Sequence, residues 1–76
     1  MPGNQSPLMI MVTDYFSNHP GVELDALEVL QRARLSTRIG KPVNMTDLRN
    51  ALDRSVELDW LKVRISGAVR RYSWAG

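Results

Sequence analysis

The chain has 76 residues, of which 43% are hydrophobic and 24% charged, and its formal net charge is +2. This length allows one domain, and this hydrophobic content excludes a chain that is disordered for lack of apolar residues. With no cysteine and one histidine, neither a disulfide nor a zinc site can supplement a small core. The core must therefore depend on packing or on self-association.

Residues 1–6 are expected to form a flexible tail, and residues 7–76 a single domain. No lysine or arginine precedes the apolar run from Leu8 to Val12. That run is too short for the core of a signal peptide or for a membrane span. Together with the lack of cysteine, this favours a cytoplasmic protein with no membrane association.

The first predicted helix begins at Ser6-Pro7 and ends at the run 18–21. Serine caps free amide groups, and proline is tolerated at the first helical position. His19 is expected to cap the far end of this helix. At helical spacing, the inward stripe consists of Leu8, Val12, Tyr15 and Phe16, with Met9 and Met11 on its flanks.

Ile10 falls on the opposite face of this helix, where the domain's own core needs no apolar residue. An apolar side chain at such a place can serve a self-complementary contact between two copies. Met9, Ile10 and Met11 are therefore the candidate interface of a homodimer.

A second helix is predicted from about Ala26 to Leu35. It begins with Asp25 followed by Glu28, the spacing of a capping box. The preceding residues 21–24 alternate and predict a short strand that pairs with a later one. Residues 36–43 contain Gly40 and Pro42 and predict a loop.

The third predicted helix begins within the run 44–47, which offers two possible caps, and continues to about Leu58. The residues expected to face inward are Leu48, Ala51, Leu52, Ser55, Val56 and Leu58. The residues expected on the exposed face are Thr46, Asn50, Asp53, Arg54 and Glu57.

After Trp60 the hydrophobic period changes from helical to alternating. Residues 61–66 predict a strand, 66–68 a turn, and 69–74 a returning strand. Trp60, Tyr72 and Trp74 are expected to belong to the core. The predicted order of helix, short strand, helix, helix and hairpin describes a small α+β domain.

The last part of the chain resembles the recognition helix and wing of winged helix-turn-helix DNA-binding domains. The resemblance rests on Leu48, Ala51-Leu52, Val56, the run Leu58-Asp59-Trp60-Leu61-Lys62-Val63, Ser66-Gly67 and Arg70-Arg71-Tyr72. The chain departs from the family pattern at Asp59, where glycine is frequent, and in the longer connection between its second and third helices. The resemblance implies a third helix in the major groove of DNA and a hairpin tip near the backbone. Winged helices also serve as protein-interaction modules, so both functions stay open.

Positive charge is concentrated in two segments that contain no acid. The segment 62–76 supplies the main expected phosphate contacts, Lys62, Arg64, Arg70 and Arg71. The segment 32–41 contains Arg32, Arg34, Arg38 and Lys41. A solvated helix end is favoured for these four residues, because the helix dipole stabilises cations near a helix C-terminus; Arg38 and Lys41 are secondary DNA-binding candidates. Four phosphate contacts predict a salt slope of about −3.6. The nucleic-acid assignment depends on the cationic side chains of the hairpin being free to meet a polyanion. Internal ion pairs at these arginines and the lysine, or the absence of a hairpin, would remove it.

The third helix offers Thr46, Arg49, Asn50 and Arg54 as DNA contacts. Arginine matches guanine and asparagine matches adenine in the major groove. The helix also carries acids, and Asp53 and Glu57, four residues apart, are expected to repel phosphate. The alternative is therefore a protein-interaction module that docks a partner through its first helix or its acidic third helix.

The sequence contains no nucleophile motif, phosphate-binding loop or carboxylate pair at functional spacing. The single histidine, His19, cannot alone anchor catalysis or a metal ion. We therefore expect no enzymatic activity, no metal and no cofactor.

Overall fold

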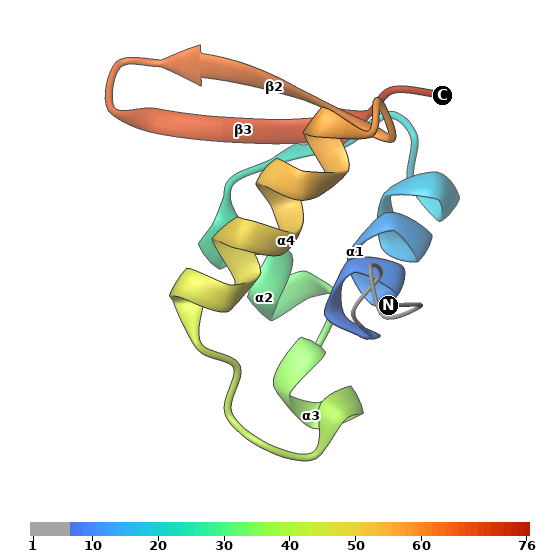
Figure 1. The fold of residues 1–76 in the computed structure, drawn as a ribbon, viewed down its shortest axis with the longest axis vertical. Coiled ribbons are helices and arrows are strands. Elements are labelled where there is room, and N and C mark those ends of the chain that lie inside the picture. Colours follow the sequence, from blue (N-terminus) through green and yellow to red (C-terminus); the bar gives the residue numbers. More distant parts are fainter. Residues whose placement is uncertain (1–6) are drawn as a thin grey trace.

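The computed structural model describes residues 7–76 and has a mixed α+β architecture that fits the description of a small winged helix (Figure 1). Its elements in chain order are α1 (Pro7–Asn18), β1 (Glu23–Leu24), α2 (Ala26–Arg32), α3 (Leu35–Ile39), α4 (Met45–Glu57), β2 (Leu61–Ser66) and β3 (Val69–Trp74). The predicted tail 1–6 and the predicted Ser6 cap lie outside the described residues.

The three strands form an antiparallel sheet in the order β1-β3-β2. Leu24 of β1 is opposite Tyr72 of β3, which confirms the prediction that the short strand pairs with a later one. The turn between β2 and β3 places Gly67 at a φ of +62°. Glycine is favoured there because it adopts positive φ without steric cost.

The core lies where α1, α2 and α4 meet beneath the sheet. Its largest fully buried side chains come from every one of these elements and from α3, and they include Phe16, Val29, Leu35, Leu48 and Leu52. The hairpin joins this core through Leu61 and Tyr72, which are each 2% exposed. In Figure 1 the hairpin lies at one end of the longest axis and α3 at the other.

Local sequence signals place the ends of three helices as predicted. Asp25 and Glu28 form a complete capping box at the start of α2. The side chain of Asn44 accepts a hydrogen bond of 2.7 Å from the Thr46 amide at the start of α4. At the end of α1, the His19 ring lies 2.9 Å from the Tyr15 carbonyl oxygen and stacks on the Tyr15 ring.

The predicted second helix is in fact two helices, so the expected loop 36–43 is wrong over residues 36–39. The helix α2 ends at Arg32, and Arg34 adopts a left-handed conformation with φ of 52°. This conformation interrupts the helical hydrogen bonds and redirects the chain. The redirected chain buries Leu35 completely and forms the short helix α3.

Three predictions near the ends of helices are wrong. Leu58 is 38% exposed because α4 ends at Glu57, and Trp60 is only half-buried and lies outside the buried core cluster. Met9, expected on the edge of the stripe and at a dimer contact, is 3% exposed. Asp59 has a φ of 61°, so aspartate occupies the left-handed position for which glycine is favoured.

Candidate nucleic-acid interface

The first half of α4 presents a polar outer face, because Leu48 and Leu52 anchor its opposite side in the core. Thr46, Arg49 and Asn50 are all exposed. Within residues 7–76, the side chains of Arg49 and Asn50 have no hydrogen-bond or ion-pair partner. These two side chains are therefore available to an external ligand.

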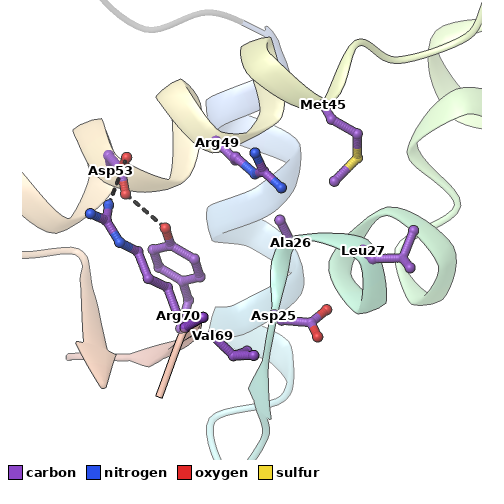
Figure 2. A pocket seen from close by; sticks show the side chains of 10 residues that line it. Asp25, Ala26, Leu27, Met45, Arg49, Asp53, Val69 and Arg70 are labelled. Atoms are coloured by element: carbon purple, nitrogen blue, oxygen red, sulfur yellow. Dashed lines mark hydrogen bonds and ion pairs between the residues drawn. The ribbon is translucent and has the colours of Figure 1, made fainter. Parts of the chain in front are cut away.

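Asp53, predicted to be exposed, instead attaches the hairpin to α4. Its carboxylate accepts a hydrogen bond of 2.7 Å from the Tyr72 hydroxyl and lies 3.5 Å from Nη1 of Arg70 (Figure 2). Burial, together with the hydrogen bond to Asp53, raises the pKa of Tyr72 to about 12. Tyr72 therefore remains a neutral donor throughout the physiological range.

Glu57, the second acid on this face, is paired along the helix. Nη1 of Arg54 donates to Oε1 of Glu57 at 3.0 Å, one turn away. Both Asp53 and Glu57 thus have a cationic partner, which reduces the repulsion expected between this face and phosphate. The sequence had indicated Arg54 as a DNA contact, but this pair means that its side chain is not free.

The expectation of free cationic side chains on the hairpin is wrong for its three arginines. Arg64 donates from Nε and Nη2 to the two carboxylate oxygens of Glu23 on β1, which lowers the pKa of Glu23 and raises that of Arg64. Arg71 lies 3.8 Å from Oε1 of Glu28 on α2. Arg70 pairs with Asp53 on α4.

Of the four hairpin cations, Lys62 alone is exposed and without an ion pair in the described part of the chain. The arginine pairs are themselves solvent-accessible, with Arg64 66% and Arg70 59% exposed. Such pairs contribute about 0–1 kcal/mol each, so phosphate could compete for the guanidinium groups. Each exchange would leave an unpaired carboxylate beside the phosphate.

Charge counts show that the hairpin side of the molecule is not positive. Residues 23–28 and 45–76 contain six bases against seven acids, a net charge of −1. The bases are Arg49, Arg54, Lys62, Arg64, Arg70 and Arg71, and the acids are Glu23, Asp25, Glu28, Asp47, Asp53, Glu57 and Asp59. Residues 29–44 carry four bases and no acid, so the positive charge lies at the other end of the fold.

A groove of about 430 Å³ opens between the start of α2, α4 and the tip of the hairpin (Figure 2). Its apolar lining includes Leu27 and Val69, which are 52% and 40% exposed. The guanidinium of Arg49 points into this groove from α4. Asp53, which also lines this groove, directs its carboxylate to Tyr72 and Arg70 of the hairpin.

A second groove, of about 670 Å³, lies between the start of α1, residues 39–44 and the other flank of α4. It brings Lys41 to the same surface as Asn50 and Arg54. The secondary candidate Lys41 therefore adjoins the outer face of α4.

No family model, curated protein or solved structure matches the chain. In the part of the chain that the structure describes, no three acidic or histidine side chains are grouped so that they could hold a metal ion. Over the same range, no helix has the length and apolar character needed to cross a membrane. The function must therefore be argued from the site itself.

The candidate dimer contact survives only in part. Ile10 is 52% exposed, as its position on α1 predicted. Met9 is buried in the domain, and Met11 is half-buried and packs against the core. Any contact between copies on this face would therefore centre on Ile10.

Proposed function

We propose that the chain is a small DNA-binding protein of the winged helix type, acting as a transcriptional regulator or an accessory factor of a nucleoprotein assembly. The first half of α4 would enter the major groove. The observation that carries the proposal is that Arg49 and Asn50 lie exposed and unpartnered on the outer side of a helix anchored by Leu48 and Leu52. Arginine reads guanine and asparagine reads adenine by paired hydrogen bonds.

The pairing of Asp53 and Glu57, two of the three acids on α4, supports this proposal. Arg70 and Arg54 compensate Asp53 and Glu57, so the reading face meets less repulsion than its sequence suggests. Binding would require neither catalysis nor a cofactor, and a cytoplasmic location is part of the proposal. Thr46, at the start of the helix, would contact a base edge or a phosphate.

The test is fluorescence anisotropy with short DNA duplexes recovered from a random pool by the parent protein. Asn50→Ala is expected to relax preference at one base position, since a lost paired contact reduces discrimination by about 1–3 kcal/mol. Gln31→Ala is the matched control, because Gln31 is an exposed amide on α2. A parent protein that binds no duplex at about 50 mM salt would overturn the proposal.

A homodimer would increase affinity by placing two copies of α4 on neighbouring half-sites. We expect Ile10→Glu to shift a dimer toward monomer with little loss of stability, because Ile10 is exposed. Sedimentation of the parent and the variant tests this. A parent protein that is monomeric at high concentration would contradict it.

A protein-docking domain is the second candidate, and the groove of Figure 2 favours it. Leu27 and Val69 offer apolar contacts there, and Arg49 offers an unpaired positive charge. This combination fits a partner segment that carries an aliphatic side chain beside a carboxylate. Absence of duplex binding by the parent protein would favour this candidate over DNA binding.

A further inference from the structure

We propose that the main phosphate-contacting surface is not the hairpin but the α3 segment, defined here as Arg32, Arg34, Arg38 and Lys41. This inference rests on the proposed DNA-binding function. It assigns the backbone contacts of the duplex to the end of the fold opposite the hairpin, and it leaves base reading to α4.

Exposure and lack of partners are the first argument. All four side chains of the α3 segment are exposed, and none has an ion pair within residues 7–76. No acid occurs between Glu28 and Asp47 in the sequence, and Asp47, whose side chain lines the same groove as Lys41, does not pair with it. The three hairpin arginines each have a carboxylate partner.

The backbone at Arg34 is the second argument. Its φ of 52° lies in the left-handed region, where glycine at the end of a helix avoids a steric cost. Arginine occupies this position instead. The Arg34 carbonyl accepts a hydrogen bond from the Arg38 amide at 3.0 Å, so these two cations stand one helical turn apart.

Position relative to α4 is the third argument. Lys41 lines the same groove as Asp47, Asn50 and Arg54, so the Lys41 end of the α3 segment flanks the reading half of α4. In Figure 1 the hairpin lies beyond the opposite end of α4. With 13 residues, α4 is about 20 Å long, enough to span a major groove about 12 Å wide. The α3 segment would meet one phosphate strand and Lys62 the other.

Favourable helix dipoles explain only part of the cluster. Arg32 and Arg38 lie in the last turns of α2 and α3, where a cation is stabilised by the helix. Lys41 lies in the following loop, and Arg34 lies at a backbone position that disfavours it. A duplex contact would supply a reason for Arg34 and Lys41, which the helix dipoles do not.

The experiment compares two double variants with the parent protein in a salt series of duplex binding. Arg38→Gln/Lys41→Gln removes two basic side chains that have no ion-pair partner. It should lower the magnitude of the salt slope by about 1.8, with a loss of affinity of roughly 60-fold at about 0.1 M salt. Glu23→Gln/Arg64→Gln removes one ion pair of the protein without changing its net charge and should leave the salt slope unchanged.

The outcomes separate this inference from the proposed function. Duplex binding whose slope is unchanged in Arg38→Gln/Lys41→Gln would overturn the inference and leave DNA binding in place. No duplex binding by the parent protein would overturn both. Binding of the parent to polyglutamate in place of the duplex would overturn both as well, and would identify an acidic protein as the partner. Circular dichroism confirms that each variant is folded.

Discussion

The hairpin and the α3 segment each carry four bases, but the fold treats them in opposite ways. Glu23, Glu28 and Asp53 come from three different elements to meet the hairpin arginines. Within residues 7–76 none of the α3-segment cations forms an ion pair, and all of them are exposed, although Asp47 lines the same groove as Lys41. Equal counts of positive residues in a sequence therefore give one region whose arginines are paired with acids and one region whose cations are exposed and unpaired.

This comparison teaches that a run of arginines and lysines predicts a polyanion site only when the positions of distant acidic residues in the fold are known. Arg64 and Glu23 are separated by 41 residues and meet because β1 and β2 flank β3 on its two sides. The two regions can be distinguished experimentally, because ion-paired arginines and unpaired cationic side chains respond differently to substitution, salt and pH.

The largest effect should follow from removing all unmatched charge, by replacing Arg32, Arg34, Arg38 and Lys41 with glutamine. Each phosphate contact contributes a factor of about 8 to the affinity at 0.1 M salt, so the affinity for the duplex should fall by roughly three orders of magnitude or more. Anisotropy titration measures this loss, with thermal unfolding as the folding control. A loss below about 10-fold would place the phosphate contacts elsewhere.

A smaller effect should follow from disrupting the hydrogen bond and ion pair by which Asp53 attaches the hairpin to α4. Tyr72→Phe removes a hydrogen bond to the Asp53 carboxylate and is expected to cost about 1.5–3 kcal/mol of unfolding free energy. Chemical denaturation measures this cost. Stability equal to that of the parent would show that the Asp53 contact does not hold the hairpin in solution.

The same tyrosine gives a pH signature. Because the pKa of Tyr72 is raised from 10 to about 12, its contribution is fully present below pH 10 and is lost as pH rises toward about 12. Parent stability should fall over this range more steeply than that of Tyr72→Phe. Parallel alkaline profiles would contradict the raised pKa, and with it the burial of the Tyr72 hydroxyl beside Asp53.

Arg34 allows stability and binding to be moved in opposite directions. Arg34→Gly should relieve the left-handed strain at φ 52° and raise stability by about 1 kcal/mol, a rise of roughly 4–8 °C in Tm. The same change should lower the magnitude of the salt slope by about 0.9. Calorimetry and anisotropy on one sample test both parts, and a gain in stability with an unchanged slope would remove Arg34 from the contact surface.

The smallest effect concerns the exposed pair of Glu23 and Arg64. Because Arg64 lowers the pKa of Glu23, the pair contributes above pH 4.5 and its contribution is lost as pH falls through the lowered pKa. Glu23→Gln should therefore show a slightly shallower acid unfolding profile than the parent. Superimposable profiles would indicate that the pair does not form in solution.

Much of the fold was predictable because it depends on local signals. Periodicity placed α1, α4 and the hairpin, and the capping residues Asp25 and Asn44 placed two helix starts. The left-handed Arg34 was not predictable, because burial of Leu35 by distant elements decides it. The predictions for the site residues divide in the same way.

Asn50 was correctly expected on the exposed face, because the helical period determines which way it faces, and the DNA-binding candidates Arg49 and Lys62 are exposed as well. The pairing of Arg64, Arg70 and Arg71 depends on tertiary neighbours that no local pattern contains. One signal was available for Glu23. Its place on a short strand predicted to pair with the hairpin put a carboxylate near the hairpin bases.

The most direct test is amide chemical-shift mapping during titration of the isotope-labelled parent protein with a short duplex at low salt. We predict that the largest changes fall on the amides of residues 32–41 and 46–50, with smaller changes near Lys62. Changes confined to residues 61–74 would contradict the account and return the DNA contact to the hairpin.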